Sequence, residues 1–410
     1  MNNSDSPDHI EYIRTEVEGK GWINEEIQEL NSSLKICCIP LPRRFFLFVK
    51  YIAPTLILLV SFAADIFSGV AVSVRHYRDG HIWWFSLTVV FISAPAVMFI
   101  AHAILQTITN PDIQLSKKLL WIVLYICTGG GFLLWPLWSY VKKLVYAIRA
   151  FADEENSMIH LEKFHSIGAI GDNMHKMLKA FLQSAPQLLL QLYILLSFPK
   201  QDSHTVIAEI VSIIFSLNAL TVVIVHFEVN SKHHPSRTAR SEQSPEVNDL
   251  CCVIVEYLWW LFSIASRVLA LAFFASVFKY WVFVICAIHA ATLSTCLIFN
   301  HPSYSLNNFI IAIFMGFVYI FCFVEYKVDF GTLGKVIGLY ILYYAFTFSQ
   351  NICMILSAYF LAVGDYFYHL PIVIVHFVCF FLGIVFMLFY LGMLRPFYLY
   401  LINKSKLPVA

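Results

Sequence analysis

The chain has 410 residues, of which 59% are hydrophobic and only 13% are charged, with a mean hydropathy of +0.72 and a formal net charge of +1. This composition excludes an ordinary soluble domain, in which about 25% of residues are charged. The near-neutral charge excludes a nucleic-acid-binding surface, because such a surface needs a concentrated basic excess. The sequence therefore predicts a polytopic membrane protein that has lipid as its main solvent.

Ten apolar segments follow one another along the chain and give the main structural signal. Most of them reach the roughly 20 residues that a spanning helix needs, and they lack the strict alternation of barrel strands. The fold class is therefore predicted to be all-α and polytopic. The segments are residues 45–73, 83–105, 119–138, 180–198, 205–228, 252–277, 280–299, 308–325, 336–362 and 370–394.

Two of the ten segments are predicted not to cross the membrane. The third contains glycines at 129–131 followed by Pro136, which weaken a helix near its middle, and the eighth is short, with Gly316 inside it. We predict that both are re-entrant, half-membrane helices, which leaves about eight transmembrane helices. Irregular backbone at that depth needs cover from protein or from a wet cavity.

The segments divide into two halves around a polar stretch, 229-VNSKHHPSRTARSEQSPEVNDL-250. Each half has five segments with the third one short, a hydropathy pattern that predicts two pseudo-symmetric repeats. With both termini in the cytosol, most Lys and Arg residues, including those from Lys142 to Lys179, fall on the inner side, as the positive-inside rule requires. The predicted parts are a cytosolic N-terminal segment (1–44), a first membrane repeat (45–228), a cytosolic linker (229–251), a second membrane repeat (252–394) and a short cytosolic tail (395–410).

Neither an enzyme nor a metalloprotein is predicted. The chain has no Gly-rich phosphate loop with Lys, no nucleophile elbow and no HExxH, and its ten cysteines lack metal-ligand spacing. No catalytic residue, cofactor or metal is therefore expected. Cys37-Cys38 and Cys251-Cys252 resemble juxtamembrane acylation sites, with free buried thiols as the alternative.

Two charged residues lie inside predicted spans, Asp65 in the first segment and Arg267 in the sixth. A central charge costs about 2.5 to 3.5 kcal/mol on insertion scales, so each needs a partner or water. Because each lies in the first segment of its half, a shared midline would bring them close together, in a structural ion pair or in a functional cavity. Gln350 and Asn351 add an uncharged polar patch to the second half.

The stretch 181-FLQSAPQLLLQLYILL-196 is apolar but carries Gln183, Gln187 and Gln191 at intervals of four, with Ser184 beside them. This spacing places the three glutamines on one face of a helix. The stripe is either a site of hydrogen bonding between helices or a polar track. Three glutamines in register favour the track.

Several runs in the chain resemble the XK-related membrane protein family. The most specific is 178-LKAFLQSAPQLLLQLYIL-195, accompanied by 266-SRVLALAFFASVF-278. Further similar runs are 83-WWFSLT-88 and 316-GFVYIFCFVEYKVDFGTLGKVIGLYILYY-344. The resemblance extends over about residues 55–394 and implies eight spans plus two half-membrane helices in two pseudo-symmetric halves.

The resemblance also implies a function and a set of partners. Several members of the family move phospholipids, including phosphatidylserine, between the leaflets of the plasma membrane without ATP, often after caspase cleavage during apoptosis. The implied partners are phospholipids, a caspase, and a single-span accessory subunit or a second copy of the chain. The lipid-path candidates are Asp65, Gln183, Ser184, Gln187, Gln191, Arg267, Gln350 and Asn351.

Activation and two alternative functions stay open at this point. Asp8 ends 5-DSPD-8, a D-x-x-D pattern that is the candidate cleavage site. Gln183 stands where many family members have an acidic residue, and it would hold headgroups less strongly. The alternatives are an adaptor that recruits a lipid-transfer protein through residues 107–118, and a solute transporter or channel. Residues 139–152 predict an amphipathic helix with Val141, Leu144, Val145, Ile148 and Phe151 on its apolar face, which lies on the inner leaflet or packs on the cytosolic side.

Overall fold

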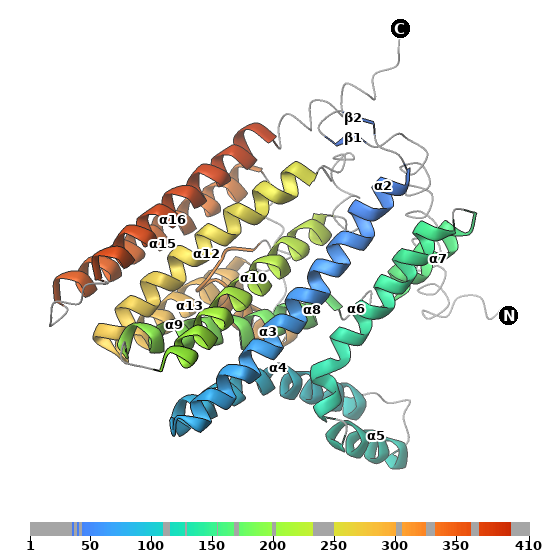
Figure 1. The fold of residues 1–410 in the computed structure, drawn as a ribbon, viewed down its shortest axis with the longest axis horizontal. Helices are drawn as coiled ribbons and strands as arrows, with labels where there is room; N and C mark the ends of the chain where they lie inside the picture. Colours follow the sequence, from blue (N-terminus) through green and yellow to red (C-terminus); the bar gives the residue numbers. More distant parts are fainter. Residues whose placement is uncertain are drawn as a thin grey trace, which may run out of the picture. The chain divides into compact units, whose positions relative to one another are not determined.

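The computed structural model of this chain is an all-α polytopic membrane protein (Figure 1). Within the described residues, the only strands are β1 (Lys35–Ile36) and β2 (Ile39–Pro40), which pair antiparallel. The structure describes residues 35–36, 39–40, 43–109, 115–127, 129–153, 155–167, 172–198, 202–232, 250–300, 306–324, 333–361 and 369–394.

Seven helices among the described residues are long and apolar enough to cross a membrane. They coincide with seven of the eight predicted spans, and the eighth, α15 (Leu333–Leu361), is a helix of 29 residues. The predicted fold class is therefore confirmed. The seven lie in α3 (Ala53–Arg78), α4 (Ile82–Thr109), α8 (Asp172–Lys179) continued by α9 (Ala185–Ser197), α10 (Ser203–Lys232), α12 (Leu250–Phe278), α13 (Trp281–Asn300) and α16 (His369–Phe389) with η3 (Tyr390–Leu394).

The predicted eighth segment is short in the structure as well. It forms α14 (Leu306–Val318), a helix of 13 residues, after which the chain leaves the helix and continues without regular structure to Val324. Thirteen residues rise only about 20 Å, whereas the hydrocarbon core is about 30 Å thick. The helix thus has the half-membrane length that was predicted for it.

The predicted third segment is arranged differently. α5 (Leu115–Cys127) has 13 residues, and α6 (Gly129–Ala152) begins at the first of the three glycines. The prediction that these glycines weaken the middle of a helix is therefore wrong, because they stand at the start of one. Glycine is a poor helix former, so three in a row favour a helix boundary. The predicted amphipathic stretch 139–152 is the C-terminal part of α6.

Two π-helical segments precede Ala-Pro pairs. η1 (Phe48–Ile52) leads into α3 just before Pro54, and η2 (Ala180–Ser184) joins α8 to α9 just before Pro186. In both, the N–H of the alanine before the proline bonds to the carbonyl five residues earlier. Proline has no N–H and its ring clashes with the carbonyl four residues before it, so a wider turn fits there. The helix therefore continues through each proline.

The contacts within the chain define two units, each with its own core. One comprises residues 1–59, 135–172 and 249–251, and its core joins α2 (Arg43–Leu47), η1, α6 and α7 (Ser157–Ser166). The other comprises residues 60–134, 173–248 and 252–410, and its core centres on α12, whose spanning stretch is 56% buried. The division into two repeats stays a prediction.

The face of α6 that packs in the first core is only partly the predicted one. Leu144 and Phe151 pack in this core as expected, together with the buried Ala147. Val145 and Ile148 are exposed instead, by 41% and 48%. The amphipathic helix is therefore present, and its buried face is rotated relative to the prediction.

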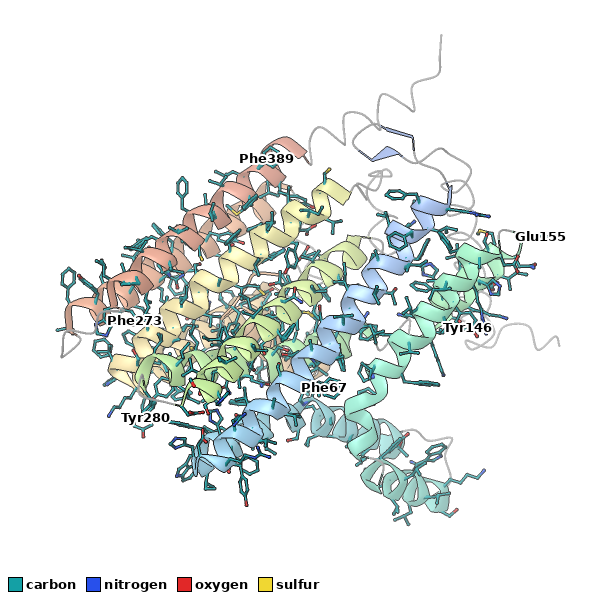
Figure 2. The ribbon with its side chains drawn as sticks, in the orientation of Figure 1. Phe67, Tyr146, Glu155, Phe273, Tyr280 and Phe389 are labelled. Carbon is teal, nitrogen blue, oxygen red and sulfur yellow. The ribbon has the colours of Figure 1, made fainter. Side chains whose placement is uncertain are left out.

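Large apolar side chains point outward from the helices of the second unit. Phe67 of α3 is 69% exposed, Tyr280 is 79% exposed and Phe389 of α16 is 41% exposed, and all three are labelled in Figure 2. Soluble monomers rarely expose such extended apolar surface. These outward faces are suited to contact with lipid tails.

Candidate functional site

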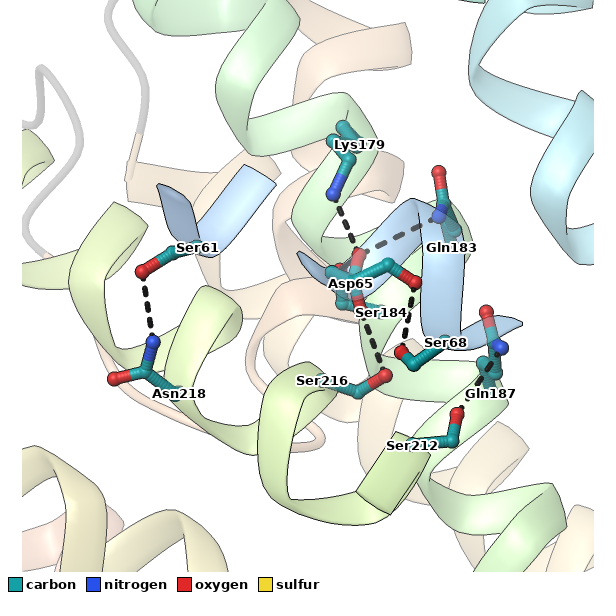
Figure 3. Close-up of polar contacts among 10 residues, drawn as sticks. All are labelled: Ser61, Asp65, Ser68, Lys179, Gln183, Ser184, Gln187, Ser212, Ser216 and Asn218. Carbon is teal, nitrogen blue, oxygen red and sulfur yellow. Dashed lines mark hydrogen bonds and ion pairs between the residues drawn. The ribbon is translucent and has the colours of Figure 1, made fainter. Parts of the chain in front are cut away.

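Asp65 is the centre of a buried polar cluster between α3, η2 and α10. Its Oδ2 accepts hydrogen bonds from Lys179 Nζ at 2.5 Å, Ser184 Oγ at 2.9 Å and Gln183 Nε2 at 3.4 Å. Its Oδ1 accepts one from Ser216 Oγ at 2.7 Å (Figure 3). The carboxylate has no exposed area and the Lys179 side chain is only 5% exposed, so this is a buried ion pair with three further donors.

The polar cluster continues along α9. Gln187 Nε2 donates to Ser212 Oγ of α10 at 3.4 Å, and Gln191 Nε2 donates to Thr88 Oγ1 of α4 at 3.4 Å. Gly69 of α3 faces Gln187 so closely that an added Cβ would overlap its carboxamide. The absence of a side chain at Gly69 is therefore what lets α3 approach the stripe.

A buried histidine and glutamate form the far end of this arrangement. His76 Nε2 of α3 lies 3.3 Å from Gln191 Oε1 and 3.9 Å from Glu209 Oε1 of α10. The side chains of His76 and Glu209 both have no exposed area. We define the polar column as the buried set Asp65, His76, Thr88, Lys179, Gln183, Ser184, Gln187, Gln191, Glu209, Ser212 and Ser216.

A second chain of hydrogen bonds lies beside the column and connects three helices. Asn218 Nδ2 of α10 donates to Ser61 Oγ of α3 at 2.7 Å (Figure 3), and Tyr257 of α12 donates to Asn218 Oδ1 at 2.7 Å. These contacts tie α3 and α12 to opposite sides of the same α10 side chain. They help to fix the helices that enclose the column.

The column is closed in this structure. Gln183, Gln187 and Gln191 have no exposed area, so the predicted stripe lies inside the helix bundle and not in an open groove. Two of its acceptors, Gln183 Oε1 and Gln187 Oε1, have no hydrogen-bond partner among the described residues. Buried acceptors without donors are costly, so these two oxygens are available to a donor that enters the column.

Arg267 forms a different cluster on α12. Its Nε donates to the Ile320 carbonyl at 2.8 Å, its NH1 group to Asn351 Oδ1 at 2.6 Å and its NH2 group to Gln350 Oε1 at 2.5 Å. His289 Nδ1 of α13 lies 3.5 Å from NH2 and 3.1 Å from Gln350 Oε1. The cluster therefore joins α12, α13 and α15 to the segment after α14.

The expectation that Asp65 and Arg267 share one site is wrong. The partners of Asp65 come from residues 179–216, whereas those of Arg267 come from residues 289–351, and the two sets have no member in common. The structure thus groups Gln183, Ser184, Gln187 and Gln191 with Asp65. It groups Gln350 and Asn351 with Arg267.

Sequence reasoning missed the cation that neutralises Asp65. The positive-inside rule assigned Lys179 to the cytosol, yet it lies within the candidate span Lys176–Ser197. Lys179 stands four residues before Gln183 and continues the stripe by one turn, which is the signal that could have identified it. Ser212 and Ser216 of α10 were also missed, although with Glu209 they have a spacing of three and four that likewise marks one helical face.

The other predicted sites belong neither to the polar column nor to the Arg267 cluster. Asp8, residues 110–114 of the predicted adaptor loop and Cys37-Cys38 fall outside the described residues. Cys251 and Cys252 are free thiols, and Cys252 is buried. No group of three or more His, Cys, Asp or Glu side chains in the described part of the chain could hold a metal ion.

A protein-family model and a known protein both match parts of this chain. The family model described as XK-related protein matches residues 54–396. A protein of Pan troglodytes named endoplasmic reticulum membrane adapter protein XK is 37% identical over 112 residues. Those residues are 27% of this chain and 23% of that protein, so the match spans less than a quarter of the relative's length.

Proposed function

This chain belongs to the XK-related protein family, and from that premise we propose that it moves phospholipids between membrane leaflets without ATP. The observation that carries the proposal is the polar column. A phospholipid crosses a bilayer slowly because its headgroup must leave water, and polar side chains that replace this hydration lower the cost. The acyl tails stay in the hydrocarbon while the headgroup passes between the helices.

The length of the column fits this task. From Lys179 to Gln191 the helix rises about 18 Å, which is more than half of the roughly 30 Å hydrocarbon thickness. We assign the phosphate to Lys179 and the amine of serine or ethanolamine to Asp65. The free carboxamide oxygens of Gln183 and Gln187 supply further acceptors for the amine.

A closed column implies that lipid movement needs a conformational change. The headgroup can enter only when α3 moves away from η2, α9 and α10, which requires breaking the Asp65–Lys179 ion pair or its neighbours. We propose cleavage after Asp8 by a caspase at the plasma membrane as the trigger, on the basis of the 5-DSPD-8 pattern. The consequence would be exposure of phosphatidylserine.

A membrane adaptor is the second candidate function. It is supported by the closure of the column, in which Asp65 and Lys179 neutralise each other without a ligand. It is also supported by the name of the Pan troglodytes relative, which is that of an adapter protein. In this case the column holds the helices together, and a cytosolic segment such as residues 107–118 recruits the partner.

Lipid movement by the purified full-length protein in liposomes separates the two candidates. The liposomes carry fluorescent phosphatidylserine or phosphatidylcholine, and dithionite quenches the dye in the outer leaflet. The protein is measured intact and after removal of residues 1–8, with empty liposomes as the control. Folding is checked by size-exclusion chromatography and circular dichroism.

Each outcome assigns a function. Quenching beyond half of the dye supports a scramblase, and quenching only after truncation supports a lock at the N-terminus. Quenching that stops at half for both folded forms rejects lipid movement and favours the adaptor. Deleting residues 107–118 should then abolish partner recruitment in cells.

A further inference from the structure

Arg267 carries a buried positive charge that the described residues do not neutralise. Its side chain is 1% exposed, and its three hydrogen-bond acceptors are a backbone carbonyl and two carboxamide oxygens. These groups align dipoles on the guanidinium but add no negative charge. A buried charge without an opposite charge is strongly unfavourable, so the arrangement calls for an anion.

A small cavity lies beside this charge. It has a volume of about 30 Å³ and is lined by α12, α15, α16 and the segment after α14. Its lining includes Trp260, Ser263, Arg267, Thr347 and Asn351. Such a volume is more than the 10 to 15 Å³ or so that one water molecule needs by the same measure.

The lining also presents an unused hydrogen-bond donor. Trp260 is 1% exposed, and its indole Nε1 has no hydrogen-bond partner among the described residues. An indole N–H can only donate, so only an acceptor can satisfy it. The guanidinium has five N–H donors, of which the three hydrogen bonds above use three, and NH2 also lies 3.5 Å from His289 Nδ1. The cavity thus combines a cation that keeps a spare donor with a second donor without an acceptor.

We propose that this cavity binds a small monovalent anion, with chloride as the physiological candidate. The anion neutralises Arg267 and accepts from the Trp260 N–H. A monovalent anion matches the single positive charge of Arg267, whereas a phosphate dianion would leave an unpaired buried charge. The proposal does not depend on whether the chain moves lipids.

The test is thermal unfolding of the full-length protein in detergent at constant ionic strength. Sodium gluconate is replaced stepwise by sodium chloride, sodium bromide or sodium phosphate. We expect chloride and bromide to raise the unfolding temperature in a saturable manner, and phosphate to behave as gluconate does. Equal unfolding temperatures in all four salts would mean that water fills the cavity, and would overturn the proposal.

Two variants and one control locate the effect. Trp260→Phe keeps the ring and removes the N–H, so it should weaken the apparent chloride affinity by about tenfold. Gln350→Glu places a carboxylate against Arg267 and should abolish the chloride dependence while the protein stays folded. Trp138→Phe changes an exposed ring and should leave the dependence intact.

The variants also give results that count against the site. If Trp260→Phe and Gln350→Glu both keep the chloride dependence of the unmodified chain, chloride binds elsewhere and the assignment is wrong. Stabilisation by phosphate to the same extent as by chloride would equally reject a cavity that selects a monovalent anion. Only a halide response that both variants reduce supports it.

Discussion

The polar column around Asp65 and the cluster around Arg267 differ in how they stabilise a buried charge. Asp65 meets a lysine ammonium and three further donors, all from the chain itself. Arg267 meets only neutral acceptors. The Asp65–Lys179 pair is neutral by itself, whereas Arg267 has no opposite charge among its partners and adjoins a cavity.

This difference suggests different roles for the two regions. An ion pair that is neutral by itself can keep the column closed without a ligand, and the column can open only if that pair is broken. A cluster with an excess charge is completed by something that binds to it. Substitutions that change the charge in one region should therefore have effects that do not transfer to the other.

The largest effect is expected from Lys179→Met. This change leaves Asp65 buried without its cation and should lower the free energy of unfolding by about 3 to 5 kcal/mol. The double variant Asp65→Asn with Lys179→Met removes both charges and should recover more than half of that loss. Titration with sodium dodecyl sulfate in mixed micelles measures the free energy of unfolding of each variant. Lys117→Met, which changes an exposed side chain of α5, is the control. If Lys179→Met lowers the free energy of unfolding no more than this control does, the ion pair does not stabilise the fold.

The same Gln→Glu change should affect the free energy of unfolding differently in the two regions. At Gln187 it buries a carboxylate beside Ser212, without a cationic partner among the described residues, and should cost about 2 kcal/mol or more. At Gln350 it supplies the negative charge that Arg267 lacks and should leave stability unchanged or raise it. Unfolding titrations of the two variants in a chloride-free buffer compare them directly. Equal losses at both positions would contradict the distinction between the regions.

A smaller loss should follow from Gly69→Ala. The added Cβ overlaps the Gln187 carboxamide, and overpacking of this kind costs about 1 to 3 kcal/mol. Shortening Gln187 to Ala in the same chain should restore part of the loss, because the overlap disappears. Gly392→Ala, where an added Cβ has open space, serves as the matched control in the same unfolding assay. An additive double variant would show that the two residues do not meet.

The smallest expected effects concern the hydrogen bonds to the two carboxylate oxygens of Asp65. Among the described residues, Ser216 is the only donor to Oδ1, whereas Ser184 is one of three donors to Oδ2. Ser216→Ala should therefore cost about 1 to 3 kcal/mol, and Ser184→Ala about 1 kcal/mol or less. Ser93→Ala, whose hydroxyl bonds only to carbonyls of its own helix, is the control for both. The reverse order would mean that the carboxylate is oriented differently from the structure.

Helical periodicity let the sequence predict which side chains share a face. Gln183, Gln187 and Gln191 do lie on one buried face, because their spacing is a local property of the α-helix. Segment lengths likewise predicted the short α14 and eight spans, seven of which the structure confirms, since hydrocarbon thickness sets the length of a crossing helix. The start of α6 was harder to place, because glycine weakens a helix without saying on which side the helix resumes.

The sequence by itself determined that this chain is an all-α membrane protein with charges buried in two of its spans, because composition and period act along the chain. Only the tertiary structure decided that Asp65 pairs with Lys179 and that Arg267 pairs with Gln350 and Asn351. These partners are 83 to 114 residues apart. The choice among all possible partners depends on how helices pack, and no local pattern encodes it.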